Sequence, residues 1–219
     1  MRAVCLLSGG MDSCVSAFVA KNEGYTIYAL TFNYGQRNRK EIECAKEIAK
    51  ALEAKEHLII NADLRSIGGS ALTGDMEIPE KGEGIPPTYV PARNTIFLAY
   101  ALAYAEARNA DAIFIGANAI DYSGYPDCRA EYIQAMQKVA NIGTKRGVEG
   151  KSIKIIAPLI NLSKAEIVKK GVELGAPFEK TWSCYRETEK ACGRCDSCRL
   201  RLKGFKEAGI KDPIEYENK

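Results

Sequence analysis

Short apolar runs alternate with amphipathic segments through the first 175 residues. The apolar runs are rich in β-branched and aromatic residues, and we expect strands over residues 3–6, 25–32, 57–60, 112–116 and 153–159. Between them, apolar residues recur at three- and four-residue spacing, which predicts helices over residues 14–20, 39–52, 95–108, 129–140 and 163–174. Because strand and helix alternate, we predict an α/β fold with a doubly wound, mostly parallel five-stranded sheet and helices on both faces.

Two segments depart from this alternation. Residues 61–93 lose the periodicity and accumulate Gly and Pro, which favours a lid beyond the sheet, with a disordered excursion as the alternative. Residues 176–219 follow the last predicted helix of the sheet domain and contain a cysteine cluster. The 219 residues suit one domain with a small appendage. We therefore predict a nucleotide-binding domain over residues 1–175 and a zinc-binding helical tail over 176–219.

Charge and composition narrow the class of ligand. The chain has 31 Lys and Arg against 28 Asp and Glu, a net charge of +3, which favours a nucleotide or small acid over a nucleic acid or membrane partner. No leader-like segment opens the chain, and no apolar run approaches the roughly 18 residues that a membrane helix needs. We expect a cytoplasmic location.

The segment between the first strand and the first helix has the composition of an anion site. Leu7-Ser8-Gly9-Gly10-Met11-Asp12-Ser13 offers two glycines for close approach of backbone N–H groups, together with hydroxyl donors at a helix N-terminus. An ordinary strand-to-helix turn explains the same composition. Neither the Walker pattern nor the dinucleotide pattern fits, because Gly150-Lys151-Ser152 lacks its first glycine and Gly82-Glu83-Gly84 lacks its third.

The cysteine cluster has metal-site spacing. Cys184, Cys192, Cys195 and Cys198 lie within fifteen residues, which matches a closed tetrahedral zinc site with a structural role. An iron-sulfur cluster is the alternative, but the further Cys-Pro of the bacterial ferredoxin run is replaced by Leu202 and Lys203.

A polar segment follows the fourth predicted strand. Residues 117–129 contain two carboxylates, and Asp121 or Asp127 could accept hydrogen bonds from adjacent N–H groups of a guanine-like ring. A surface turn before the next helix is the alternative. Cys128 is a poor candidate nucleophile, because the only histidine, His57, begins a strand elsewhere.

The last predicted helix of the sheet domain begins with a capping box. Ser163 and Glu166 have the spacing of reciprocal N-terminal capping, so both are explained structurally. Lys164 lies between them at the positive end of a helix, where a cation is unfavourable unless an anion is near. We therefore regard Lys164 as a candidate phosphate contact.

Several segments in order along the chain resemble a known family. The Ser8–Ser13 loop is similar to the pyrophosphate loop of PP-loop ATP pyrophosphatases. Together with the segments below, it resembles the 7-cyano-7-deazaguanine synthase family; a departure is Ala92, where that family more often has glycine. The segments are Tyr34-Gly35-Gln36-Arg37, Val90-Pro91-Ala92-Arg93-Asn94, residues 121–129, Thr181-Trp182-Ser183-Cys184 and the Cys192–Arg201 run.

The resemblance implies a chemistry and a set of roles. It implies an ATP-dependent ligase that converts 7-carboxy-7-deazaguanine and ammonia to the 7-nitrile, a queuosine and archaeosine precursor, with release of AMP and pyrophosphate. It also implies Mg²⁺ with Asp12 as a ligand, oxyanion stabilisation by Lys164 or Arg93, one structural Zn²⁺ per chain and a homodimer. ATP would contact Leu7, Ser8, Gly9, Gly10, Met11, Asp12, Ser13 and Cys14; the deazaguanine acid would contact Asp121, Tyr122, Ser123, Asp127 and Arg129.

Two other classes of protein could explain parts of the sequence, and the chain length bears on the source of the ammonia. A PP-loop enzyme that adenylates a tRNA base would share the loop and the cysteines, but near-neutral charge argues against direct nucleic-acid binding. A non-catalytic zinc-ribbon module that binds nucleic acid is disfavoured, because the cysteines occupy only a tail on a large nucleotide-type domain. A chain of this length leaves little room for a glutaminase domain, so we expect ammonia from solution.

Overall fold

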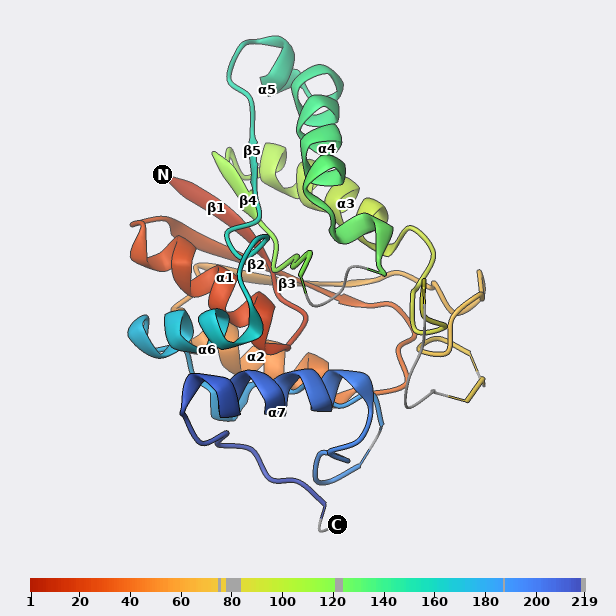
Figure 1. The fold of residues 1–219 in the computed structure, drawn as a ribbon. Coiled ribbons are helices and arrows are strands. Elements are labelled where there is room, and N and C mark those ends of the chain that lie inside the picture. The colour runs from red at the N-terminus through yellow and green to blue at the C-terminus, as the bar shows by residue number, and fades with distance from the viewer. Residues whose placement is uncertain (75, 78–83, 121–123, 187, 218–219) are drawn as a thin grey trace.

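The computed structural model describes residues 1–74, 76–77, 84–120, 124–186 and 188–217. Its described residues form a sheet of five parallel strands in the order β3-β2-β1-β4-β5, which confirms the predicted fold class (Figure 1). The strands are β1 (Arg2–Leu6), β2 (Thr26–Asn33), β3 (Glu56–Asn61), β4 (Ala112–Phe114) and β5 (Lys154–Ile156). The order reverses at β1, and ligands of such sheets bind at this switch point, beyond the carboxyl ends of the strands.

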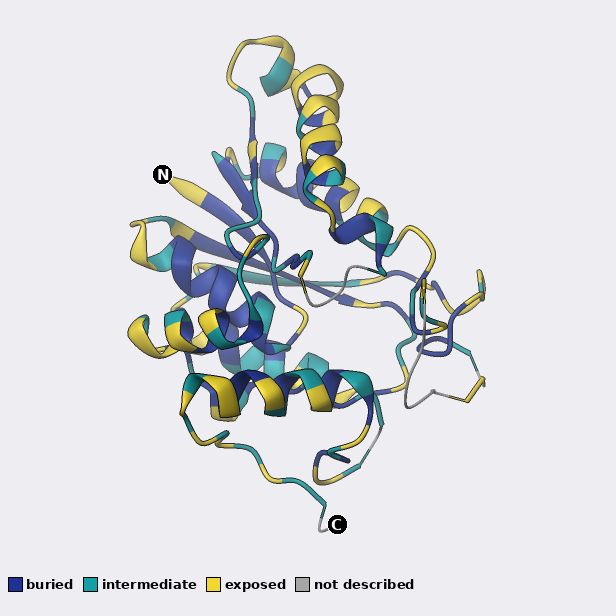
Figure 2. Ribbon diagram, viewed as in Figure 1, coloured by how far each residue is buried: buried dark blue, intermediate teal, exposed yellow. Residues whose placement is uncertain are grey.

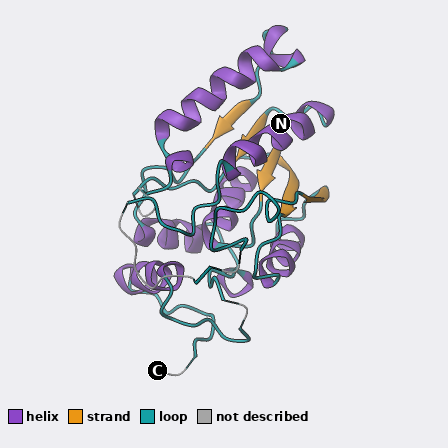
Figure 3. Ribbon diagram, turned by 90° about the vertical axis from the view of Figure 1, so that its right-hand side faces the viewer, coloured by secondary structure: helices purple, strands orange, loops and turns teal. Residues whose placement is uncertain are grey.

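Helices cover both faces of the sheet, as the alternation predicts. One face packs against α1 (Met11–Asn22), α2 (Lys40–Ala51) and α6 (Lys164–Glu173), and the opposite face packs against α3 (Arg93–Ala107) and α4 (Ala130–Gly143). The remaining helices are α5 (Lys145–Val148) and α7 (Asp196–Ala208), with short 3-10 turns at Pro126–Cys128 and Phe178–Lys180. Figure 3 shows loops gathered beyond the carboxyl ends of the strands.

Strand β1 divides the core into two halves. Val4 and Leu6 point into the cluster beneath α3 and α4, whereas Ala3 and Cys5 point into the cluster beneath α1 and α2. This alternation follows from the two-residue period of a strand. The central strands are buried on both faces, as Figure 2 shows, so their apolar runs are nearly continuous rather than alternating with polar residues.

Some predicted boundaries differ from the structure. Strand β5 ends at Ile156 rather than residue 159, because Pro158 has no N–H to donate and the chain turns, with Ile160 N donating to Ala157 O over 3.2 Å. Strand β4 ends at Phe114 rather than residue 116. Helix α5 was not predicted; it is a single turn with Thr144 as its N-cap, whose hydroxyl accepts from Gly147 N at 2.9 Å.

Helix α3 begins two residues earlier than predicted. Its first turn is held by Asp127, whose Oδ2 accepts a hydrogen bond from Asn94 N at 3.0 Å. The residue before the helix, Ala92, has a left-handed backbone with φ 51°. Glycine adopts this conformation without strain, which gives a physical reason for the glycine that the family more often has at position 92.

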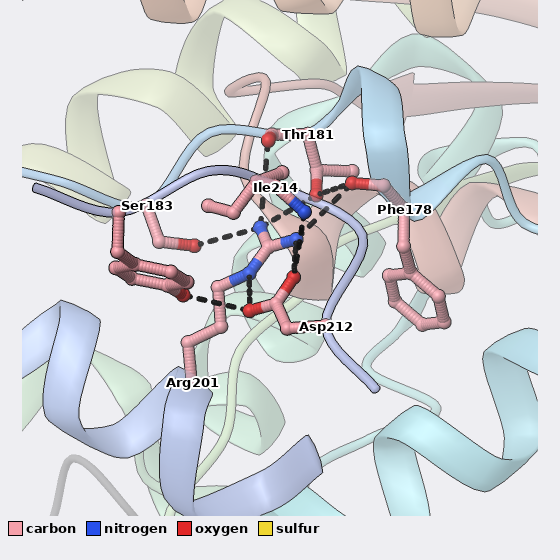
Figure 4. A network of polar contacts seen from close by, with 7 residues as sticks. Phe178, Thr181, Ser183, Arg201, Asp212 and Ile214 are labelled. Carbon is pink, nitrogen blue, oxygen red and sulfur yellow. Dashed lines mark hydrogen bonds and ion pairs between the residues drawn. The ribbon is translucent and has the colours of Figure 1, made fainter. Parts of the chain in front are cut away.

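A buried ion pair holds the C-terminal tail together (Figure 4). Arg201 of α7 is 1% exposed, and its Nε and Nη2 donate to the two carboxylate oxygens of Asp212 at 2.8 and 2.9 Å. The guanidinium also donates to Thr181 Oγ1 at 2.7 Å and to Phe178 O at 3.1 Å. Tyr216 donates its hydroxyl to Asp212 at 2.7 Å. These bonds tie α7 to the chain that enters the cysteine cluster.

The tail shares a hydrophobic core with the sheet domain. Phe205 of α7 packs in the same cluster as α1 and α6, with its ring 5.2 Å from the Phe178 ring in an edge-on arrangement. A separate small cluster surrounds Trp182 and the four cysteines. The division at residue 175 stays a prediction.

Described parts of the 61–93 segment pack onto the sheet domain. Leu64, Leu72 and Val90 are buried in the cluster beneath α3. Thr88 and Tyr125 share a hydrogen bond of 2.8 Å between their hydroxyls, which joins the segment to the polar stretch after β4. Whether this segment acts as a lid stays a prediction. None of the helices in the described residues has the length and apolar character needed to span a membrane.

Candidate active site

A cavity opens beyond the carboxyl ends of β1, β2 and β4. Its wall is built by the loop after β1, the start of α3, the start of α6 and the tail segment around Trp182. The structure therefore brings together Asp12, Arg93 and Lys164, the three residues predicted to be catalytic, from distant parts of the sequence.

The loop after β1 has no room for a side chain at Gly9. Gly9 has φ 85°, and a Cβ there would lie 2.0 Å from the backbone oxygen of Glu41. Trp182 N donates to Gly9 O at 2.9 Å, so the loop is held between α2 and the tail. Gly10 precedes α1 as its N-cap without a side-chain cap bond. The first residues of α1 line the cavity, so the N–H groups at this helix end are near a place where an anion could bind.

Two serine hydroxyls order the same loop. Ser8 Oγ and Ser13 Oγ lie 3.1 Å apart, and Ser13 Oγ also donates to Gly10 O at 2.9 Å. Both serines line the cavity. Leu7, Met11 and Asp12 also line it, whereas the Cys14 side chain is fully buried within α1. Their predicted contacts with ATP stay a prediction.

Lys164 and Asp12 form an ion pair at the head of α1. Lys164 Nζ lies 2.8 and 3.0 Å from the two oxygens of Asp12, and the lysine is 5% exposed. The capping box predicted for α6 is confirmed, because Ser163 Oγ accepts from Glu166 N and Glu166 accepts from Ser163 N. Helix α7 confines the lysine, since a Cβ at Gly204 would lie 2.3 Å from Lys164 Cγ.

Arg93 enters the cavity from the start of α3. Its Nη1 donates to the Tyr34 hydroxyl at 3.3 Å, and its guanidinium lies 5.7 Å from the centre of the Tyr34 ring. Burial raises the pKa of Tyr34 to about 12, so the phenol stays neutral. Arg93 thus contributes a cation to the cavity wall.

The predicted substrate segment is only partly within the described residues. Asp121, Tyr122 and Ser123 lie outside them. Asp127 is buried behind Asn94, which lines the cavity, and Arg129 is exposed at the N-cap of α4. A role in substrate recognition for these five residues stays a prediction.

Cys128 lines the cavity without the environment of a nucleophile. Asn94 Nδ2 approaches its sulfur at 3.4 Å, and burial raises the pKa of the thiol to about 11. A thiol with such a pKa is almost entirely protonated at neutral pH. The structure therefore agrees with the expectation from the sequence that Cys128 is a poor candidate nucleophile.

Sequence reasoning missed a carboxylate in the cavity wall. Glu41 lies in the first turn of α2 and lines the cavity near Arg93. Burial raises its pKa to about 7, and Arg93 partly offsets this. The sequence feature that could have identified Glu41 is its position one helical turn after the Tyr34–Arg37 segment at the end of β2. Phe97, also missed, stacks on Phe32 with ring centres 3.9 Å apart.

The four predicted metal ligands come together. The sulfurs of Cys184, Cys192, Cys195 and Cys198 all lie within 4.8 Å of one another and are buried, and none is in a disulfide. Backbone N–H groups of Arg186 and Cys192 each donate to Cys184 Sγ at 3.4 Å. Hydrogen bonds from Cys195 and Cys198 lower the pKa of the Cys184 thiol. This sulfur set fits a tetrahedral zinc ion.

The sheet, the glycine loop and the Asp12–Lys164 pair define an α/β protein with a polar cavity at the switch point of a parallel sheet. A solved structure titled as a 4-thiouridine synthetase–RNA complex with bound ATP shares the fold, with a TM-score of 0.50 and 20% identity over 95% of this chain and 50% of that chain. The chain belongs to the family described as queuosine biosynthesis protein QueC, which matches residues 2–209.

Curated relatives agree with this membership over nearly the whole chain. A protein of Acetivibrio thermocellus is 62% identical over 98% of this chain and 97% of its own length. A protein of Citrifermentans bemidjiense is 57% identical over 99% of this chain and 98% of its own length. Both are named 7-cyano-7-deazaguanine synthase. The resemblance inferred from the sequence is confirmed.

Proposed function

We propose that this protein is an ATP-dependent ligase that converts 7-carboxy-7-deazaguanine and ammonia into 7-cyano-7-deazaguanine. AMP and pyrophosphate are the other products. The observation that carries the proposal is the Lys164–Asp12 pair beside the glycine loop at the head of α1, in a chain of the queuosine biosynthesis family. Such an arrangement places a cation, a carboxylate and a helix N-terminus around one anion.

The proposed reaction explains why a phosphate site would lie within a cavity. A carboxylate oxygen is a poor leaving group, so it is first joined to AMP, and ammonia then displaces AMP to give an amide. Dehydration of the amide to a nitrile needs a second oxygen activated in the same way. Each activation releases pyrophosphate. An acyl-adenylate hydrolyses in water, so exclusion of solvent favours the product.

The residues of the cavity have separate roles in this proposal. The backbone N–H groups at the start of α1, with Ser8 and Ser13, would hold the pyrophosphate. Lys164 or Arg93 would stabilise the oxyanions that develop at the acyl carbon. Asp12 offers a carboxylate at the same place, a donor that suits Mg²⁺ shared with phosphate oxygens, and Mg²⁺ there would neutralise developing negative charge.

The zinc site has a structural role in the proposal. Four thiolates leave no position for water, so the metal stabilises the tail rather than acting in the reaction. We propose one zinc per chain. The tail in turn contacts the glycine loop through Trp182 and confines Lys164 through Gly204.

Several finer statements belong to the same proposal. The segment 121–129 would contact the deazaguanine, and the 61–93 segment would close over it as a lid. Ammonia would enter from solution, and the protein would be a homodimer without direct nucleic-acid contact. Reduced thiols and ATP are typical of the cytoplasm, which we propose as its location.

One assay tests the activity directly. The protein is incubated with ATP, ammonium and the carboxy-deazaguanine, and AMP, pyrophosphate and nitrile are measured. We expect all three products without added RNA, with more AMP than nitrile because two activations serve each product. Formation of AMP only after addition of tRNA would contradict the proposal and favour a base-modifying PP-loop enzyme.

A further inference from the structure

Two carboxylates of the described residues line the cavity, and they differ in their partners. Asp12 is paired with Lys164 at 2.8 Å. The carboxylate of Glu41, from the first turn of α2, makes no side-chain hydrogen bond or ion pair within the described part of the chain, although the charge of Arg93 acts on it. Asp127, a sequence candidate for base recognition, lies behind the wall, and its Oδ2 already accepts from Asn94 N.

The position of Glu41 is fixed by its backbone. Its carbonyl oxygen is so close to Gly9 that only glycine fits there, which places the first turn of α2 directly against the anion loop. Its side chain is half-buried beside Arg93, and the lost hydration raises its pKa to about 7. A partly desolvated carboxylate gains from any ligand that supplies N–H donors.

The neighbouring wall suits a flat heterocycle. Phe97 stacks on Phe32 with an angle of 3° between their rings, and the Tyr34 ring lies 5.5 Å from Phe97. All three aromatic residues line the cavity together with Glu41. An apolar wall with one acceptor group beside it favours a ring whose edge carries donors.

We propose that Glu41 accepts the two adjacent N–H groups of the deazaguanine ring, N1–H and the 2-amino group. This inference rests on the proposed function and names the residue that selects its substrate. The two parallel donors match the two oxygens of one carboxylate, as in bidentate pairing with a guanidinium. Glu41 is then a specificity residue: it holds the ring while the 7-carboxylate is activated elsewhere in the cavity.

The test compares two acids that differ at one position. Wild type, Glu41→Gln and Glu41→Asp are assayed with 7-carboxy-7-deazaguanine and with its analogue lacking the 2-amino group. An amide offers one oxygen and turns a donor toward the ring, so we expect Glu41→Gln to raise KM for the natural acid about 10- to 100-fold. In Glu41→Gln the preference for the natural acid over the analogue should fall about tenfold, while KM for ATP and for ammonium stays within about twofold. Glu41→Asp should keep the preference for the natural acid.

The control is Glu43→Gln on the same helical turn. Glu43 is exposed and paired with Lys46 at 2.8 Å, so its substitution leaves all the KM values unchanged. Binding of each acid, followed by the fluorescence of Trp182, the single tryptophan in the cavity wall, reports on Glu41 without turnover. Wild type that binds the acid but forms no AMP or nitrile would contradict the proposed function alone.

Three outcomes would overturn the inference. The preference between the two acids could be unchanged in Glu41→Gln. KM for ammonium could rise while KM for the acid does not, which would make Glu41 an ammonia site. Asp127→Asn could abolish the preference while Glu41→Gln keeps it, which would return base recognition to the segment after β4.

Discussion

Lys164 Nζ lies 2.8 Å from Asp12 Oδ2, although 152 residues separate the two in the sequence. The pair joins the start of α6 to the start of α1 at the switch point of the sheet. A cation at a helix N-terminus is unfavourable by itself, and Asp12 offsets this cost. The pair thus holds a buried lysine and a carboxylate together at the N-terminus of α1, where we propose that the pyrophosphate binds.

Loss of the lysine charge should slow the reaction. We expect Lys164→Met to lower kcat about 10²- to 10³-fold, because a stabilising cation at the developing oxyanion is removed. The measurement is AMP and nitrile formation at saturating substrates. Lys169→Met changes an exposed lysine of the same helix and should leave kcat unchanged. Equal loss in both variants would contradict the assignment.

The contact between α7 and Lys164 should be sensitive to one methyl group. A Cβ at Gly204 would overlap Lys164 Cγ, so Gly204→Ala must displace the lysine or separate the helices. We expect a loss of about 1–3 kcal/mol in the free energy of unfolding and a lower kcat. Lys206→Ala, at an exposed position of α7, serves as the control. Unchanged kcat in Gly204→Ala would show that the tail does not position Lys164.

Removal of the metal should unfold the tail. We expect Cys198→Ser to lose zinc and to lower the melting temperature, because a closed thiolate site contributes its binding free energy to folding. Metal content is measured on purified protein, and wild type should contain one zinc per chain. Cys44→Ala changes a thiol outside the quartet and should retain the metal. Iron with sulfide in wild type would contradict the zinc assignment.

The Arg201–Asp212 pair should respond strongly to removal of one partner. Both groups are buried, with side chains 1% and 6% exposed, so Arg201→Met leaves an uncompensated carboxylate. We expect a loss of about 3–5 kcal/mol in the free energy of unfolding. Lys203→Met breaks an exposed pair with Glu207 on the same helix and should cost less than about 1 kcal/mol. Urea titration measures both, and similar small losses would contradict this account.

The strained residue before α3 should accept glycine. A left-handed backbone costs an ordinary residue about 1–2 kcal/mol, whereas glycine loses about 0.5–1 kcal/mol more entropy on folding. We therefore expect Ala92→Gly to stabilise the protein by about 0.5–1 kcal/mol. Ala99→Gly, at an exposed position within α3, should destabilise it by about 1 kcal/mol. Denaturant unfolding compares the two, and a loss in Ala92→Gly would refute the strain.

Local patterns were enough for much of the site. The glycine loop, the cysteine spacing and the Ser163–Glu166 capping box are each read within a few residues, and the structure places each of them as expected. Predicted boundaries differ from the structure at β5 and α3, among other elements. At β5 the outcome depends on Pro158, and at α3 it depends on the carboxylate of Asp127, which is 33 residues from its partner Asn94.

The sequence by itself determined the fold class, the glycine loop after β1, the grouping of the four cysteines and the family, because these depend on periodicity and on residues close together in the chain. Only the tertiary structure decided the strand order, the pairing of Lys164 with Asp12 and the contrast between Asp127 and Glu41. The physical reason is that hydrogen-bond partners and burial are set by packing between distant segments. The sequence alone does not show whether an aspartate or glutamate caps a helix or faces a cavity.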